Sequence, residues 1–340
     1  MSSTARTSAP GVQGVSVVVL GGGTGTFTVL SALKHYVEHL TAVVNMVDDG
    51  GSTGLLRDEL GVLPPGDVRQ ALVALSLDSG LMRELMNYRF DAGTLEGHSF
   101  GNFLLTALEK ITGSFDEAVE VAGRVLAVKG GVVPVTTQDV RLALRLADGD
   151  VLRGETAIDH HKAADAGQRF ELFLDPEAHL NPRAADAIAA ADLLVMGPGS
   201  LYSSLMPIAL VKGMPEALAA SPARKVFVAN LMTKPGQTDG FAAHRFLDVI
   251  EEVTGAVFDD LVYNTAPAGG AILARYAAAG EQPVAWDREA MKDRHYTPAG
   301  APLLSDDYDH QHPADILVRR TLIRHDSDRL ARLLMRLYFS

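Results

Sequence analysis

The sequence contains no cysteine, and its basic residues are outnumbered, with 30 Lys and Arg against 42 Asp and Glu. Without cysteine the chain forms no disulfide bridge, no thiolate metal site and no cysteine nucleophile. Nucleic acids and anionic membrane surfaces attract clustered Lys and Arg, whereas this chain has a formal net charge of −12. We therefore expect neither a nucleic acid nor an anionic membrane as a partner.

Long apolar runs are missing as well. No stretch approaches the length needed to cross a bilayer, so we expect no membrane insertion. The opening segment MSSTARTSAPGVQG is small and polar and lacks the apolar centre of a signal peptide. We expect residues 1–14 to form a flexible tail, residues 15–340 to form a single domain, and the protein to be cytoplasmic.

What the sequence does contain is an alternation of strands and helices. VSVVVL (15–20) is a β-branched run typical of a strand buried on both faces. After a glycine loop comes a helical stripe formed by Leu30, Leu33, Val37 and Leu40. TAVVNMV (41–47) then reads as a second buried strand. A crossover of this kind joins parallel strands.

The same alternation returns in the second half, where DLLVM, KVFVANL and DLVYN (260–264) predict strands, the last of them the final one. In between, residues 140–158 alternate around an Asp-Gly turn and predict a β-hairpin, which FELFL (170–174) extends. This insertion is compatible with a smaller lobe around residues 132–175. We predict a Rossmann-like, doubly wound α/β fold with a mostly parallel sheet and a β-hairpin insertion.

Three helix starts carry capping signals. Asp67 is expected to cap a helix that runs to Leu75, and Ser114 fits a capping box before another helix. Asn181 precedes Pro182, as at the start of many helices. The end of the chain, 315–337, is predicted to be a basic helix.

Gly21, Gly22, Gly23, Thr24 and Gly25 form the first candidate site, directly after the first strand. Glycines let a phosphate approach backbone N–H groups, and the following helix adds its positive end. The spacing departs from the dinucleotide fingerprint, because Thr26 or Thr28 stands where the third glycine belongs, and the P-loop lysine is missing. Phosphate binding is therefore favoured over NAD binding.

Asp48 and Asp49 follow the second strand and precede the run GGSTG, which contains Ser52 and Thr53. A carboxylate at this position can accept ribose hydroxyls. Two carboxylates can instead hold Mg²⁺ beside a diphosphate, with Asp48 or Asp49 as ligand. Both alternatives stay open. The run GGSTG itself predicts another anion-binding loop.

Further candidate residues lie in loops that follow other predicted strands or open helices. They are Asp67 in LPPGD, His98 and Asn102 in GHSFGN, Gly197, Gly199, Ser200, Leu201 and Ser204 in GPGSLYSSL, and Asn230 and Lys234 in NLMTKPGQT. Arg324, near the basic end, is expected to reach a phosphate. DHH (159–161) and DDYDHQH (306–312) fit no metal-ligand geometry, so we interpret them as solvated loops.

Six ordered motifs together resemble one family. LGGGTGT, VDDGGSTGLLR, LPPGDVR, GHSFGN, GPGSLYSS and NLMTKPGQT are similar to the CofD-like superfamily and, within it, to the YvcK branch of gluconeogenesis factors. The resemblance runs from Val15 to Leu337. The superfamily includes the 2-phospho-L-lactate transferase of coenzyme F420 synthesis, a Mg²⁺-dependent enzyme that uses a guanosine diphosphate conjugate and a deazaflavin. Its glycine loop typically reads nearer GGVGG, and it lacks GGSTG.

The YvcK resemblance implies a non-enzymatic binder of UDP-sugars such as UDP-N-acetylglucosamine. It implies support of cell shape and wall synthesis during growth on gluconeogenic carbon sources, through a protein partner and without a required cofactor. In that case Asp48 and Asp49 face the nucleotide, the glycine loops cradle phosphates, and Asn102 and Ser204 supply neutral hydrogen bonds. Gln70, Lys234 and Gln237 depart from the usual family residues.

Three hypotheses therefore stand. The first is a UDP-sugar-binding regulator, and the second is a Mg²⁺-dependent transferase of the phospholactyl type. The third and weakest is an NAD-dependent oxidoreductase, against which the glycine spacing argues. No residue is demanded by a catalytic mechanism, which favours the binder. The acidic surface and basic C-terminal helix hint at a homo-oligomer.

Overall fold

The computed structural model describes residues 12–77, 80–161, 170–305 and 323–340. Seven strands form one parallel sheet in the order β10-β9-β8-β7-β1-β2-β3. They are β1 (Val12–Gly21), β2 (Val37–Val44), β3 (Gly131–Pro134), β7 (Leu193–Met196), β8 (Arg224–Val228), β9 (Asp260–Asn264) and β10 (Thr297–Ala301). The predicted doubly wound sheet is confirmed.

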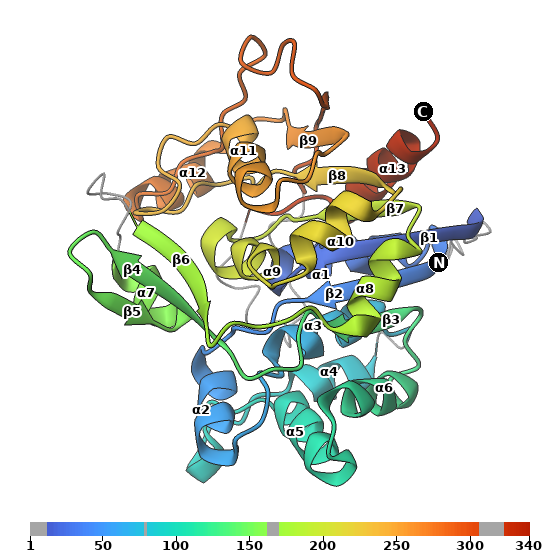
Figure 1. Cartoon of the computed structure of the whole chain (residues 1–340), viewed down its shortest axis with the longest axis vertical. Helices are drawn as coiled ribbons and strands as arrows, with labels where there is room; N and C mark the ends of the chain where they lie inside the picture. The colour runs from blue at the N-terminus through green and yellow to red at the C-terminus, as the bar shows by residue number, and fades with distance from the viewer. Residues whose placement is uncertain (1–11, 78–79, 162–169, 306–322) are drawn as a thin grey trace.

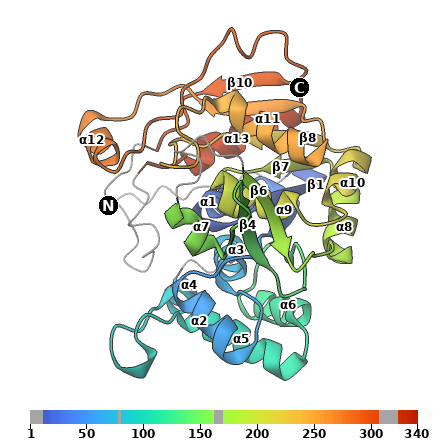
Figure 2. The ribbon, with the colours of Figure 1, turned by 60° about the vertical axis from the view of Figure 1, so that its left-hand side comes forward.

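Helices cover both faces of this sheet (Figures 1 and 2). One group contains α1 (Gly23–Leu33), which packs between α3 (Gly66–Leu75) and α13 (Ser327–Tyr338). The other contains α8 (Pro182–Ala189), α9 (Met206–Ala209), α10 (Met214–Ala220) and α11 (Ala243–Thr254). Because both faces are covered, Val17, Val18, Val19 and Leu20 of β1 are all buried, as their β-branched run predicted.

The remaining helices lie toward one end of the sheet and in the connections. They are α2 (Gly51–Leu60), α4 (Leu81–Asn87), α5 (Phe100–Thr112), α6 (Phe115–Val125), α12 (Gly270–Ala278), and the short turns η1 (Gly93–Leu95) and η3 (Leu201–Leu205). Ser114 and Asn181 cap α6 and α8 as predicted, accepting from the backbone N–H groups of Glu117 and Arg183. No helix among the described residues is long and apolar enough to cross a membrane.

The predicted hairpin insertion forms a separate antiparallel sheet beside the parallel one (Figure 1). Its order is β5-β4-β6, with β4 (Arg141–Leu146), β5 (Val151–Arg153) and β6 (Phe170–Asp175), so residues 170–174 do extend the hairpin. The end of the predicted second arm is instead a short helix, α7 (Glu155–His161).

Three predicted boundaries were wrong, and a fourth lies outside the described residues. β1 begins at Val12, inside the expected tail, whose residues 1–11 lie outside the described part. Val37 and Leu40 belong to β2, not to the preceding helix, because pairing with β1 overrides their helical spacing. DLVYN is not the last strand, since the weakly apolar edge strand β10 follows it. Helix α13 starts at Ser327, and the expected start at 315 lies outside the described residues.

Candidate functional site

The candidate site lies where the strand order of the sheet reverses. β1 pairs with β2 on one side and with β7 on the other, and the chain continues outward from each. Ligands of open α/β sheets bind at such a switch point, beyond the carboxyl ends of the strands. Gly21–Gly25 follows β1 and Gly197–Leu201 follows β7. The fold thus brings the two predicted glycine loops together.

The two loops touch each other directly. A Cβ on Gly25 would lie 2.1 Å from the carbonyl oxygen of Pro198. Gly197 has a φ of +82°, a conformation that favours glycine, and a Cβ there would lie 2.7 Å from the carbonyl oxygen of Val228. At these positions, close packing between neighbouring loops requires glycine even without a ligand.

A cavity of about 450 Å³ opens between these loops and the segment after β8. We call it the loop pocket. The predicted residues that line it are Thr24, Gly25, Gly199, Ser200, Leu201, Asn230, Lys234 and Arg324. Thr28, Thr233, Gln237, Thr238, Tyr276 and His325 were not predicted but also line it. The lining is rich in hydroxyl and amide groups.

The buried atoms Ser200 Oγ and His325 Nε2 of this lining have no hydrogen-bond partner among the described residues. Burial lowers the pKa of His325 to about 4, so its imidazole is neutral near pH 7. Orphaned buried polar atoms are rare in folded proteins and are often satisfied by a ligand or water. The loop pocket therefore offers hydrogen-bonding capacity that the described protein does not use.

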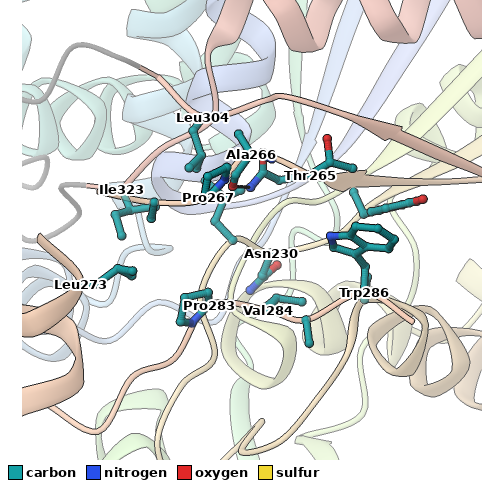
Figure 3. A pocket seen from close by; sticks show the side chains of 16 residues that line it. Asn230, Thr265, Ala266, Pro267, Leu273, Pro283, Val284, Trp286, Leu304 and Ile323 are labelled. Atoms are coloured by element: carbon teal, nitrogen blue, oxygen red, sulfur yellow. Dashed lines mark hydrogen bonds between the residues drawn. The ribbon is translucent and has the colours of Figure 1, made fainter. Parts of the chain in front are cut away.

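A second cavity of about 600 Å³ adjoins the loop pocket, sharing Asn230, Leu231 and Ile323 with it (Figure 3). It lies beyond the ends of β8 and β9, and its walls include Tyr263 and Trp286. We call it the indole pocket. Sequence reasoning missed it because its residues come from several loops without a shared motif.

Asp67 closes the other side of the first glycine loop. Its Oδ1 accepts a hydrogen bond from the backbone nitrogen of Gly23 over 2.9 Å, and a Cβ on Gly22 would lie 2.2 Å from its Oδ2. The prediction that Asp67 caps its own helix α3 was wrong, because the N-cap there is Pro65. It faces the N-terminus of α1, whose partial positive charge suits a carboxylate. Asn45, which was not predicted, donates to Oδ2 at 3.5 Å.

Asp48 is the close neighbour of Asp67. Burial and then the Asp48 charge raise the pKa of Asp67 well above its ordinary value, and burial also raises the pKa of Asp48. Arg69, missed from sequence although it lies in LPPGDVR, lowers both pKa values. A Cβ on Gly66 would lie 2.3 Å from Asp48 Oδ2, so glycine is needed for this approach.

The pair of carboxylates fits a hard divalent cation. Mg²⁺ takes oxygen ligands and is often held by one or two carboxylates plus phosphate oxygens and water. No group of three or more His, Asp or Glu side chains suited to a metal occurs in the described part of the chain. Further ligands would therefore have to come from a substrate or solvent. Residues 306–312 and the side chains of 159–161 lie outside the described part.

The structure gives Asp49 a different partner from the one expected. Its Oδ1 accepts from the backbone nitrogen of Thr156 at 3.1 Å and from Thr156 Oγ1 at 2.8 Å. A Cβ on Gly154 would lie 2.3 Å from its Oδ2. Asp49 therefore joins the segment after β2 to the start of α7, whereas the carboxylate that lies close to Asp67 is that of Asp48.

Ser52, Thr53, His98 and Asn102 lie together, at the contact between α2 and the start of α5. Asn102 donates to Ser52 Oγ at 3.2 Å and to Thr53 Oγ1 at 3.5 Å. Its Oδ1 accepts from Arg69 Nε at 2.9 Å, and Ser52 Oγ lies 3.2 Å from His98 Nδ1. Both the oxygen and the nitrogen of the Asn102 amide are thus hydrogen-bonded within the protein. These groups position the Asp48 loop.

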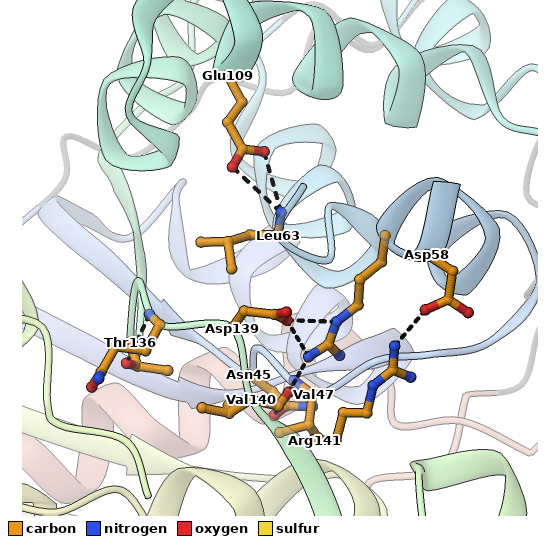
Figure 4. Close-up of polar contacts among 11 residues, drawn as sticks. Asn45, Val47, Asp58, Leu63, Glu109, Thr136, Asp139, Val140 and Arg141 are labelled. Carbon is orange, nitrogen blue, oxygen red and sulfur yellow. Dashed lines mark hydrogen bonds and ion pairs between the residues drawn. The ribbon is translucent and has the colours of Figure 1, made fainter. Parts of the chain in front are cut away.

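A second set of polar contacts anchors the far side of α2 (Figure 4). Buried Arg57 donates to Asp139 through Nε at 2.8 Å and also to the carbonyl of Val140. Arg141, at the start of β4, pairs with Asp58. The helix that follows the Asp48 loop is therefore fixed to the chain entering the small sheet.

Ser204 lies in η3, beside Gly199 rather than in the lining of either pocket. Gly199 donates its backbone N–H to Asn230 Oδ1 at 3.3 Å, which ties the loop after β7 to the loop after β8. The predicted residues thus divide into two neighbouring groups. One lines the loop pocket, and the other surrounds Asp48 and Asp67.

Comparison with known proteins identifies the family of the chain. The family profile described as 2-phospho-L-lactate transferase CofD matches residues 17–304. The chain is 37% identical over 327 residues to the gluconeogenesis factor of Bacillus subtilis strain 168, covering 95% of this chain and 98% of that protein. It is 41% identical over 281 residues to the gluconeogenesis factor of Halalkalibacterium halodurans, covering 82% and 86%.

A solved structure shares the whole architecture. A UPF0052 family member from Bacillus halodurans superposes with a TM-score of 0.85 at 35% identity, covering 96% of this chain and 100% of that one. Both the sequence and the fold comparison thus span nearly the full length of the chain. The chain belongs to the CofD family, in its gluconeogenesis-factor branch of the YvcK type.

Proposed function

We propose that the protein is a regulator that binds a UDP-sugar such as UDP-N-acetylglucosamine and acts in the cytoplasm. The observation that carries this proposal is the loop pocket at the switch point of the sheet, about 450 Å³ in volume. Three loops converge on it from the ends of β1, β7 and β8. A cavity of this size, with several convergent polar groups, suits a small-molecule ligand.

The lining matches the chemistry of a nucleotide sugar. Lys234 and Arg324 supply positive charge for a diphosphate. Hydroxyl and amide groups suit the many hydroxyls of a sugar, and the orphaned Ser200 Oγ is one such group. Among the described residues, no carboxylate contacts either histidine of the candidate site. His98 pairs with Ser52, and His325 is neutral and buried.

The names of the relatives support a metabolic context for the proposed binding. Proteins called gluconeogenesis factors match this chain over most of its length. We propose that occupancy of the loop pocket reports the supply of wall precursors to a protein partner. The protein would then support cell shape and wall synthesis during growth on gluconeogenic carbon sources, as expected from the family resemblance.

Calorimetric titration tests the proposal. UDP-N-acetylglucosamine should bind saturably, with micromolar affinity and without Mg²⁺, and should remain intact after long incubation as judged by chromatography. Ser200→Ala should weaken binding, whereas Ser305→Ala, outside the loop pocket, should not. Absence of binding, or release of UDP in stoichiometric excess over protein, would contradict a non-enzymatic binder.

A second candidate function rests on Asp48 and Asp67. Two neighbouring carboxylates of raised pKa, beside the N-terminus of α1, would hold Mg²⁺. The bound ion would neutralise a diphosphate leaving group, as a transferase of the phospholactyl type requires. In the same calorimetric series, binding of GDP that appears only with Mg²⁺ and exceeds that of UDP would make the transferase the leading interpretation.

A further inference from the structure

The indole pocket differs in chemistry from the loop pocket that it adjoins. Its walls are mostly apolar and aromatic, with Pro267, Pro283, Val284 and Trp286 among them (Figure 3). The loop pocket is lined instead by hydroxyl, amide and charged groups. The two cavities meet at Asn230, Leu231 and Ile323. One extended ligand can therefore occupy both.

Trp286 is the only tryptophan of the chain, and it is 41% exposed. Its ring centroid lies 5.7 Å from that of Tyr263, which is buried. Tyr263 is held in turn by Gly300, where a Cβ would lie 2.7 Å from the phenol ring. A fixed tyrosine thus supports an indole that keeps accessible surface, although the guanidinium of Arg288 lies over its ring at 5.9 Å from the centroid. The exposed part of an aromatic ring of this kind suits stacking by a planar ring.

Asn230 lies at the junction of the two pockets, between Trp286 and Ile323 (Figure 3). Its Oδ1 accepts the Gly199 N–H, which fixes the orientation of the amide. Its Nδ2 has no hydrogen-bond partner among the residues that the structure describes. A carboxamide N–H is a donor for the carbonyl edge of a nucleobase or for a sugar hydroxyl.

The chemical character of the lining residues changes along the edge of the sheet, and this change predicts the orientation of the ligand. The carboxylates Asp48 and Asp67 lie on the β2 side of the switch point, the loop pocket lies over β1 and β7, and the indole pocket lies beyond β8 and β9. A nucleotide sugar runs from sugar through diphosphate and ribose to base. Hydroxyls of the sugar can donate to the carboxylates, which places the sugar at that end and leaves the apolar pocket for the base.

We infer that the indole pocket is the base subsite of the ligand-binding site, where a planar heteroaromatic base stacks on Trp286 and accepts a hydrogen bond from Asn230. This inference rests on the proposed nucleotide-sugar binding. It goes beyond it by assigning the base and the sugar to opposite ends of the site. The alternative occupant is the apolar face of the sugar ring, which the following experiment distinguishes.

The single tryptophan makes the subsite observable. Wild-type protein is titrated with UDP-N-acetylglucosamine, UDP and N-acetylglucosamine 1-phosphate, with tryptophan fluorescence and calorimetry recorded in parallel. Stacking of uracil on the indole should quench the emission of Trp286 to the same extent for UDP and for the UDP-sugar. The sugar phosphate, which carries no base, should not quench.

Variants then test whether the contact contributes to affinity. Trp286→Leu should weaken the binding of both UDP and the UDP-sugar about tenfold or more by calorimetry, as expected for the loss of base stacking. Trp286→Phe keeps an aromatic ring and should retain most of the affinity. Phe339→Leu is the matched control, because Phe339 is also an exposed aromatic residue but lies outside both pockets. Circular dichroism melts verify that each variant is folded.

The outcomes test nucleotide-sugar binding and the base subsite separately. Calorimetry can show that the UDP-sugar binds while the wild-type fluorescence does not change and Trp286→Leu keeps the wild-type affinity. In that case the base subsite is overturned and nucleotide-sugar binding stands. Equal quenching by the sugar phosphate places the sugar at Trp286 and also overturns the inference. If neither UDP nor the UDP-sugar binds wild-type protein, both proposals fail together.

Discussion

A carboxylate oxygen of Asp67 lies 2.9 Å from the backbone nitrogen of Gly23, at the first turn of α1. The two residues are 44 positions apart and belong to different helices. The chain thus places its own anion at a helix N-terminus, where external phosphates commonly bind. A ligand phosphate that approached this turn would meet a negative charge, unless a cation or a proton neutralised it.

Substitution of Asp67 separates its hydrogen bond from its charge. Asp67→Ala leaves the partly buried N–H of Gly23 without its acceptor and should lower the free energy of unfolding by about 1–3 kcal/mol. Asp67→Asn keeps an acceptor and removes a buried charge, so it should retain most of the stability or increase it. Urea unfolding of both variants measures this difference. Equal losses would contradict a role for the hydrogen bond.

Gly25 provides a test of the contact between the two glycine loops. Gly25→Ala places a methyl group 2.1 Å from the carbonyl oxygen of Pro198, so backbone must shift. We expect a loss of about 1–3 kcal/mol in stability, typical of overpacking, together with weaker binding in the loop pocket. Thermal melts and calorimetry measure the two effects.

Gly270→Ala is the control for this substitution. Gly270 begins α12, and a Cβ there would meet no atom within 4 Å. Replacing a helical glycine by alanine without a clash should increase stability by about 0.5–1 kcal/mol. If both glycine variants behaved alike, the close approach of Gly25 to Pro198 would not be the cause of the loss.

The elements that could be predicted from the sequence are those whose buried residues form a continuous apolar run. Strands β1, β7, β8 and β9 are central and covered on both faces, so each is a short apolar run. The edge strand β10 reads TPAGA and carries little of that signal, so it was missed. Val37 was assigned to a helix because its spacing fits a helical face, and only pairing with β1 places it in a strand.

In the candidate site, too, the features with a local sequence pattern were predicted and the long-range contacts were not. The glycine loops were predicted because strand, loop and helix follow one another along the chain. The partners of Asp67 and Asp49 come from residues 44 and 107 positions away, which no local pattern contains. Trp286 and Asn230 meet only through folding of separate loops. Motifs therefore located the sheet edge that holds the candidate site, but not which carboxylate lies next to the first glycine loop.

Asp48 and Asp49 are adjacent in sequence but should respond differently to Mg²⁺. Asp48→Asn should reduce any Mg²⁺-dependent ligand binding, because Asp48 is paired with Asp67. Asp49→Asn should leave the Mg²⁺ dependence unchanged, because the Asp49 carboxylate bonds to Thr156. Calorimetry with and without Mg²⁺ on both variants measures the difference. A larger Mg²⁺ effect in Asp49→Asn would instead identify Asp49 as the Mg²⁺ ligand.

A double-mutant cycle tests the structural role of Asp49. Asp49→Ala and Thr156→Val each remove one side of the contact between the loop after β2 and α7. Hydrogen bonds of this kind contribute about 0.5–1.5 kcal/mol, so the two losses in unfolding free energy should be less than additive by a similar amount. Full additivity would mean that the two side chains do not interact in solution.

His325 should make the stability of the protein depend on pH. Burial lowers its pKa from the ordinary value of 6.5 to about 4 in the folded state. Between these two values the unfolded chain binds a proton that the folded chain does not, so stability is lost as the pH falls from 6.5 to 4. The loss attributable to this group amounts to about 3 kcal/mol at most.

Comparison with His325→Gln isolates this contribution, because glutamine is polar and does not titrate. The comparison is needed since Asp67, with its raised pKa, acts in the opposite direction and gains stability for the folded state as the pH falls. Urea unfolding at pH 7 and pH 5 should show a smaller decrease in the variant than in the wild type. Equal decreases would indicate that the imidazole is protonated in the folded protein, and hence that the wall of the loop pocket admits water or a counter-ion at this position.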